Sequence, residues 1–453
     1  MNSFSVQKIV NSLIWKLNIL VNQLSNSGPR PLASVFQLLN SKLKLSTFFL
    51  IPLALSLSPF SFAQISLSNG EHNLEISGSI SSFYNQRFYY NQNPENRIDD
   101  NLANPINKDK DRFGLRDMQL QLEGRIGHDF EYEFQVDFAD LANQSDLGEN
   151  PGIMDANFTY KGLKFVNATL GYQKIPYSRN SLVPFTFSPY WQRAEVARGE
   201  SFSRRDVGIM LSESFWDQKI NVYGGMFTGM GEQILSANGG DNDPSGEFEY
   251  VGRVDIAFPA RYRYRDYDIN SSPIPMFQLG AAARTVKRKY SSFLPGDDYY
   301  LRVISGQKDC FTADFSAQWK GFSTQVEWHL INVKPTNEID PSGLRYRESR
   351  GTANTKIGAN PTGFFRAGGI LATVSYASKP LKSIFSIRYD QLNPNDLVQK
   401  NTEESLTFAC AYQIRGFNSM IKAQYSYRLI DRKNPLIQRF DDQLRVGWQM
   451  LLR

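Results

Sequence analysis

Alternation of apolar and polar residues with a period of two is the main signal along this chain. Residues 129–139 read DFEYEFQVDFA, in which every second position is aromatic or valine and the others are acids or an amide. Such a period places successive side chains on opposite faces of a β-strand. Residues 406–414 and 421–429 alternate in the same way. Each of these segments therefore predicts a strand with one apolar face and one polar face.

The same pattern predicts sixteen strands after residue 64, and no sustained helical period of 3.6 residues appears there. The predicted strands cover residues 73–90, 112–126, 129–139, 153–161, 164–174, 206–213, 218–228, 248–258, 276–285, 310–320, 321–333, 364–377, 382–391, 403–415, 417–430 and 440–451. The predicted fold class is therefore all-β.

The links between these strands alternate in length along the chain. Short links such as 127–128 and 320–321 alternate with long polar links such as 91–111 and 334–363. Outer-membrane barrels sort their connections in this way, with short periplasmic turns and long extracellular loops. An even number of strands also closes an antiparallel sheet without leaving an edge in the lipid. We therefore predict a transmembrane antiparallel β-barrel of about 16 strands, although the link 259–275 is long where a short turn is expected.

One apolar stretch near the N-terminus has the features of a secretory signal peptide. Residues 46–63 read STFFLIPLALSLSPFSFA, follow Lys42 and Lys44, and end in the small residues Ser61 and Ala63 around Phe62. Their apolar run is shorter than the roughly 20 residues of a membrane-spanning helix, which argues against an N-terminal anchor. We predict an N-terminal extension and signal peptide over 1–63, with cleavage after Ala63. Residues 64–453 then form one barrel domain.

Removing the predicted signal peptide changes the charge balance. The full chain has a net charge of +5, but residues 1–64 contain five Lys or Arg and no acid. The mature chain is then neutral, so the basic isoelectric point gives no reason to expect a nucleic-acid partner. The two cysteines, Cys310 and Cys410, fall on strands that are not neighbours, and we expect no disulfide bond between them.

The sequence contains no pattern that indicates an enzyme. Its three histidines are not spaced as metal ligands, and no Gly-x-Ser-x-Gly or phosphate-binding glycine loop is present. His329 alternates toward the polar side of its strand and is the one candidate for a hydrolase base. We expect no catalytic residue, no metal and no cofactor.

Three segments carry a recognisable order of motifs: FGLRDMQLQLEGRIGHDFEYEFQVDFA (113–139), MDANFTYKGLKFVNATLGYQKIPYS (154–178) and RRDVGIMLS (204–212). Together they resemble the phosphate-selective porin (O/P type) family of Gram-negative outer membranes. The resemblance implies a sixteen-stranded homotrimeric porin whose third outside loop folds into the channel and narrows it. It also implies that basic residues in the channel select anions. The chain departs from such barrels at its end, which reads MLLR rather than ending in an aromatic residue.

The candidate constriction loop is the long basic segment 177–206. It has five arginines and three acids, Glu195, Glu200 and Asp206. The arginines that we expect to bind the solute are Arg179, Arg193, Arg198, Arg204 and Arg205. Arginine suits phosphate because its planar guanidinium forms two charge-assisted hydrogen bonds and keeps its proton. The alternative is a solvated outer loop in which these arginines pair with the loop's own acids.

Strand alternation also places charged side chains toward the lumen. The predicted basic wall consists of Arg253, Lys382, Arg388, Lys422, Arg428 and Arg445. The predicted acidic wall consists of Asp117, Glu123, Glu131, Glu133 and Asp137. A field between a basic and an acidic wall filters polar solutes. The alternative is that these charges pair across the lumen and only stiffen the barrel.

The sequence as a whole predicts an outer-membrane porin that contacts the lipid bilayer and passes small hydrophilic solutes by diffusion. Anions such as phosphate are the expected solutes. A general or sugar-type porin without anion preference is the alternative within the same class. A secreted, soluble, β-rich binding protein is the alternative outside it.

Overall fold

The structure is a computed structural model. It describes residues 65–88, 112–139, 152–197, 202–229, 231, 246–288, 306–335, 365–393, 396, 402–429 and 442–452.

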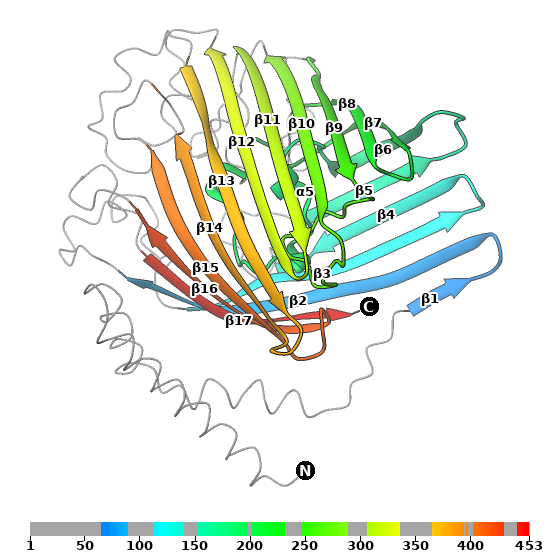
Figure 1. The fold of residues 1–453 in the computed structure, drawn as a ribbon. Helices are drawn as coiled ribbons and strands as arrows, with labels where there is room; N and C mark the ends of the chain where they lie inside the picture. The colour runs from blue at the N-terminus through cyan, green and yellow to red at the C-terminus, as the bar shows by residue number, and fades with distance from the viewer. Residues whose placement is uncertain are drawn as a thin grey trace, which may run out of the picture. The chain divides into compact units, whose positions relative to one another are not determined.

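Sixteen antiparallel strands, β2 to β17, form a closed barrel (Figure 1). The strands are β2 (His72–Phe88), β3 (Arg112–Ile126), β4 (Phe130–Asp137), β5 (Gly152–Tyr160), β6 (Asn167–Lys174), β7 (Arg205–Phe215), β8 (Ile220–Phe227), β9 (Glu249–Phe258), β10 (Met276–Arg288), β11 (Gly306–Trp319), β12 (Phe322–Pro335), β13 (Phe365–Ser378), β14 (Ser383–Asn393), β15 (Glu403–Gln413), β16 (Ser419–Arg428) and β17 (Asp442–Leu452). Each strand pairs with the next, and β17 pairs with β2 to close the sheet. The predicted barrel is confirmed, and every predicted strand corresponds to an observed one.

A short first strand, β1 (Ile65–Ser68), was not predicted. It pairs with residues 73–76 of β2, whereas β17 pairs with residues 78–88 on the same strand. Strands β1 and β17 therefore pair with the same edge of β2, β1 near its first residues and β17 along the remainder. In Figure 1 the hairpin of β1 and β2 lies beside the hairpin of β3 and β4.

The two faces of the strands differ as the alternation predicts. On β9, Tyr250, Val254 and Ile256 are exposed, whereas Arg253 and Asp255 on the opposite face are buried. Burial of the second face comes from a chain segment inside the barrel, so this face is the inner one. On β4, Phe130 and Phe134 belong to the exposed apolar face. An apolar outer band is what lipid requires of a barrel.

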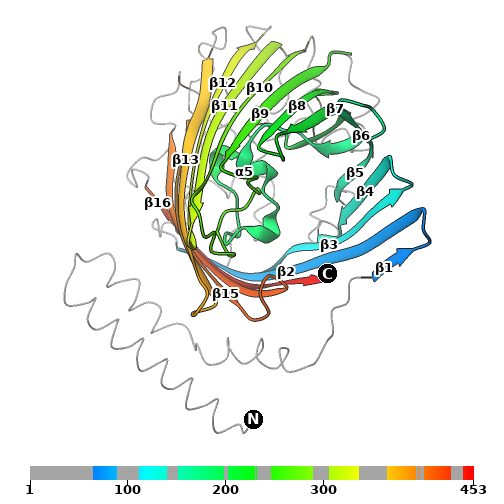
Figure 2. The ribbon, with the colours of Figure 1, turned by 45° about the vertical axis from the view of Figure 1, so that its right-hand side comes forward.

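The short helical elements of the described residues lie inside the barrel rather than around it (Figure 2). They are α5 (Arg179–Leu182), η3 (Phe185–Phe187) and η4 (Glu195–Ala197), all between β6 and β7. No helix among the described residues is long and apolar enough to cross a membrane. Both cysteines are free, in agreement with the prediction.

Candidate functional site

The segment between β6 and β7, residues 175–204, is docked on the inner face of the barrel; we call it the inner loop. Trp191 is completely buried, and its backbone N–H donates to Gln424 Oε1 at 2.6 Å. Its indole Nε1 donates to the backbone oxygen of Lys422 at 3.1 Å. Lys422 Nζ in turn donates to Ser188 O and to Gln449 Oε1, both at 2.6 Å. Strands β16 and β17 therefore hold the middle of the inner loop.

Charged groups on β14 and β16 hold the last turn of the inner loop. Arg428 forms a 2.8 Å ion pair with Glu195, whose backbone N–H donates to Asp390 Oδ1 at 3.0 Å. Arg388 donates to Gln192 O at 2.9 Å and pairs with Asp390 at 3.2 Å. Every one of these wall charges is thus used to fix the loop or its neighbours.

The start of the inner loop is held by a buried ionic cluster on β9 and β11. Arg253 pairs with Asp255 and with Asp314, both at 2.7 Å, and all three side chains have no exposed surface. The same guanidinium donates to Tyr177 O at 2.6 Å. Because a buried charge without partners is very costly, this cluster fixes the point at which the chain enters the lumen.

His329, the candidate hydrolase base, also belongs to the packing of the inner loop. Its Nε2 lies 2.9 Å from Glu327, and its ring stacks on Phe202 with centroids 5.4 Å apart. Glu327 Oε2 accepts the backbone N–H of Asn180 at 2.8 Å. The pair is therefore occupied in holding the loop.

The five predicted loop arginines have different surroundings. Arg179 is buried and donates to Ser316 Oγ and to Arg265 O. Arg205, at the start of β7, forms two hydrogen bonds with Asp155 at 3.2 and 3.0 Å. Arg193 and Arg204 are half-buried, and Arg198 lies outside the described residues. Arg179 and Arg205 are thus used for packing, while Arg193 and Arg204 remain partly open to the lumen.

Arg193 lies in a strongly basic environment. Its guanidinium caps the end of α5 by donating to the backbone oxygens of Asn180 and Val183. Burial, and then repulsion by Arg204, lower the pKa of Arg193 well below its usual value. Arg116, on β3, lies 4.0 Å above the ring of Phe185 in the same loop. We call Arg116, Arg193 and Arg204 the arginine cluster.

The predicted basic wall is present, but most of it is buried under the inner loop. Arg253, Arg388, Lys422 and Arg428 face inward and hold the loop, as described above. Arg445 is half-buried and donates to Asn85 Oδ1 at 3.0 Å. Lys382 differs from the prediction, because β14 begins at Ser383 and Lys382 is an exposed residue of the preceding turn, with φ of +48°.

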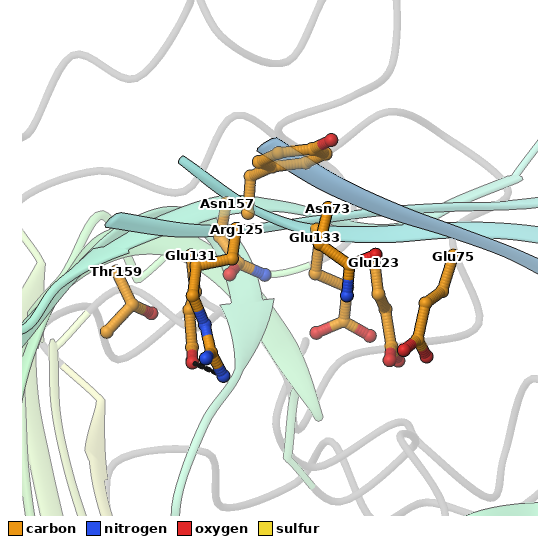
Figure 3. Close-up of a pocket in the computed structure, with 10 residues that line it drawn as sticks. Asn73, Glu75, Glu123, Arg125, Glu131, Glu133, Asn157 and Thr159 are labelled. Atoms are coloured by element: carbon orange, nitrogen blue, oxygen red, sulfur yellow. Dashed lines mark hydrogen bonds and ion pairs between the residues drawn. The ribbon is translucent and has the colours of Figure 1, made fainter. Parts of the chain in front are cut away.

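The predicted acidic wall divides into two parts. Asp117 and Asp137 are buried, and Asp137 accepts hydrogen bonds from the Met118 backbone and the Gln119 side chain. The other three acids, with Glu75, line an open pocket of about 300 Å³ on β2 to β5 (Figure 3). The labelled residues of this pocket are Asn73, Glu75, Glu123, Arg125, Glu131, Glu133, Asn157 and Thr159.

The acidic pocket is only partly neutralised. Glu131 pairs with Arg125 at 3.2 Å and with Lys161 at 2.6 Å. Glu123 and Glu133, however, are directly opposite each other on β3 and β4. Like charges in such cross-strand pairs are unfavourable. The pocket is therefore a negatively charged stretch of the lumen wall.

The unexpectedly long link 259–275 is a second segment inside the barrel, a position that the sequence did not predict. Residues 259–275, between β9 and β10, run along the short-turn end of the lumen, and we call them the inner strap. Tyr264 Oη donates to Asp255, and the buried Asp268 accepts from the backbone of Gly321 at 3.0 Å. Lys379 Nζ donates to Asn270 O at 3.0 Å. The inner strap thus joins the inner face of β9 to the β11–β12 and β13–β14 turns.

The inner strap and the inner loop contact each other directly. The Arg179 guanidinium lies 5.3 Å from the ring centroids of both Tyr262 and Tyr264, which favours cation–π attraction. Arg265 lies 5.0 Å above the ring of Phe187 in the loop. The signal that would have revealed this segment is the sequence RYRYRDYD (261–268), in which arginine and tyrosine alternate.

Removal of the Lys422 ammonium is expected to loosen the inner loop. Lys422→Ala leaves Ser188 O and Gln449 Oε1 without their buried donor, and a hydrogen bond to a charged group contributes about 1.5–3 kcal/mol. We expect amide hydrogen exchange in residues 186–193 to become at least about tenfold faster, measured by mass spectrometry. Lys164→Ala, at an exposed lysine near Phe165, is the control. Unchanged exchange in Lys422→Ala would contradict the anchoring role.

Comparisons with known proteins agree with this architecture. Residues 88–267 match the family described as phosphate-selective porin O and P, which confirms the resemblance predicted from the sequence. No curated protein matches the chain. The fold is similar to that of OmpF of Salmonella typhi in complex with daunomycin, with a TM-score of 0.51 and 10% identity over 85% of this chain and 100% of that one. It is also similar to OmpT of Vibrio cholerae lacking loop L8, with a TM-score of 0.50 and 9% identity over 84% of this chain and 99% of that one.

Proposed function

We propose that this chain, an outer-membrane porin whose residues 88–267 match the phosphate-selective porin O and P family, admits small anions by diffusion through a constricted lumen. The observation that supports this most directly is the docking of the inner loop inside the closed barrel. A loop held at that place narrows the path without blocking the whole lumen. Passage then depends on size and on fixed charge, and no covalent step is needed.

The contacts of the inner loop indicate where the path runs. Most of its hydrogen bonds and ion pairs go to strands β9 to β17, whereas the acidic pocket on β2 to β5 keeps an open volume of about 300 Å³. We infer that solutes pass between the inner loop and this acidic wall. The polar lining on both sides suits hydrated solutes.

The arginine cluster supports a preference for anions. Burial and repulsion by Arg204 lower the pKa of Arg193, and the attraction of Asp266 opposes this only in part. A bound anion would further favour the charged form, and guanidinium groups bind phosphate oxygens in pairs. We therefore propose that small anions such as phosphate are the favoured solutes.

The acidic pocket supports the second candidate, a general porin without anion preference. Glu75, Glu123, Glu131 and Glu133 face the same lumen, and most of the predicted basic wall is buried or paired. If these acids determine the electrostatic potential at the narrowest point, cations would pass as easily as chloride.

Conductance in planar bilayers distinguishes these functions. With the purified protein in a potassium chloride gradient, we expect a reversal potential with the sign of chloride permeation, and a decrease in chloride current when phosphate is added at millimolar concentration. A reversal potential near zero or of cation sign would reject the anion preference. An anion-selective current that phosphate leaves unchanged would reject phosphate alone.

Export and assembly are proposed from the sequence and the family resemblance. We propose a homotrimer in the outer membrane, which cross-linking of the detergent-solubilised protein would test. We also expect the mature chain to begin at Gln64, because Ser61 and Ala63 are the small residues that precede a signal-peptide cut. N-terminal sequencing of the protein from membranes tests this, and retention of Lys42 and Lys44 in the mature chain would contradict it.

A further inference from the structure

We infer that the inner strap carries an anion site of its own, formed by Arg261 and Arg263, on the short-turn side of the constriction. Its ligand would be a small inorganic oxyanion or halide that has passed, or is about to enter, the narrow part of the lumen. This inference rests on the proposed porin function and adds a place of binding that the sequence analysis did not contain.

The alternation of the strap directs these two arginines away from the barrel wall. Tyr262 is buried with Ala257 and Met276, which lie on the inner faces of β9 and β10. Tyr264 donates its hydroxyl to Asp255, also on the inner face of β9. Neighbouring residues of an extended chain point to opposite sides. Arg261 and Arg263 therefore project from the other side of the strap, and both are exposed.

Neither arginine is neutralised by a described neighbour. No ion pair or hydrogen bond joins Arg261 or Arg263 to another described residue. In contrast, the wall residues Arg253, Arg284 and Arg388 pair with Asp255, Glu249 and Asp390. Each exposed guanidinium thus keeps its N–H donors for a passing anion.

The two acids of the strap are buried, in contrast to this exposed pair. Asp268 is buried and accepts hydrogen bonds from the backbone N–H groups of Ser272, at 2.7 Å, and Gly321, at 3.0 Å. Asp266 is buried as well. Asp268 therefore serves the fold of the strap, and both acids of RYRYRDYD are buried while its first two arginines are exposed.

The strap is rigid enough to present a site. Its ends continue from β9 and into β10, Asp268 is hydrogen-bonded to the β11–β12 turn, and the Arg179 guanidinium of the inner loop lies 5.3 Å from the ring centroids of Tyr262 and Tyr264. Two residues of an extended chain span roughly 7 Å, so the two guanidinium groups can contact one small anion together or two in succession. Because strap and loop are in contact, this site lies in series with the arginine cluster.

Neutralising the pair tests the inference. We expect Arg261→Gln/Arg263→Gln to lower the ratio of chloride to potassium permeability about fivefold. This factor corresponds to the attraction between an anion and one positive charge at close range in a water-filled site. The phosphate concentration that halves the chloride current should rise by about the same factor. The matched control is Lys382→Gln, an exposed cation in a turn that is predicted to leave both values unchanged. A double variant that behaves like the control overturns the inference.

Restoring the charge chemically on the assembled channel separates the effect of the charge from any effect of the substitution on folding. Arg263→Cys is inserted into the bilayer and treated with a cationic or an anionic methanethiosulfonate reagent. The cationic reagent should restore the chloride preference, and the anionic reagent should reduce it further; equal responses to both overturn the inference. The unsubstituted protein, with Cys310 and Cys410, is the control for the native thiols. A cation-selective unsubstituted channel would instead reject the proposed anion preference.

Discussion

Replacement of residues 179–197 by a short Gly-Ser link will raise the single-channel conductance at least about twofold, because conductance follows the cross-section of the narrowest part of a channel. These residues include α5, η3 and η4 and lie inside the barrel (Figure 2). They contribute no strand to the sheet, so all strand pairings of the barrel remain available without them. The measurement is the distribution of conductance steps in planar bilayers under equal salt on both sides.

The same variant needs a check on its assembly. Folded barrels migrate differently in detergent gels before and after heating, and the shortened protein should keep this behaviour. An unchanged conductance in a protein that passes this check would mean that the inner loop does not limit the current. The pore size would then be set elsewhere, with the inner strap as the next candidate.

The second large effect is expected at Arg253. Arg253→Leu removes the cation from between Asp255 and Asp314, which then remain buried without their partner. Breaking a buried ion pair by removing one member costs about 3–5 kcal/mol. We expect the unfolding midpoint in urea, measured in lipid vesicles by tryptophan fluorescence, to fall by a corresponding amount.

A partial rescue separates the charge effect from lost packing. Adding Asp255→Asn and Asp314→Asn to Arg253→Leu removes the uncompensated charges and should recover part of the stability. Lys287→Leu, at an exposed cation on β10, is the matched control and should change the midpoint little. If the triple variant is no more stable than Arg253→Leu, the lost contact of Arg253 with Tyr177 O, rather than the two acids, dominates.

The strands and their faces could be predicted because the signal is local. Alternate residues of a strand face the same side, so the apolar residues next to Arg253 and Arg388 were enough to predict that these arginines face inward. The same rule predicted Lys382 to be an inward-facing strand residue, but Lys382 belongs to the turn that precedes β14. It missed β1 because Ile65–Ser68 offers only four residues of alternation.

The partners of these side chains could not be predicted in the same way. Whether Lys422 lines the lumen or holds Ser188 depends on where a loop more than two hundred residues away in the chain is docked. The inner strap was missed for a related reason, since its tyrosines and arginines carry no regular apolar period that indicates an element. The contact of this segment with the inner loop is known only from the structure, in which Tyr262 and Tyr264 lie next to Arg179.

The pairing of β17 with β2 has a consequence for biogenesis. Asn85 and Arg445, which are hydrogen-bonded across this seam, are 360 positions apart in the sequence. Contacts of such high sequence separation form late, because the entropy of a very long loop must be lost first. The sixteen other strand pairings of the described residues join consecutive strands and can form progressively from local hairpins. We therefore expect the two edges that β2 and β17 present to each other to stay unpaired until the two ends of the barrel meet.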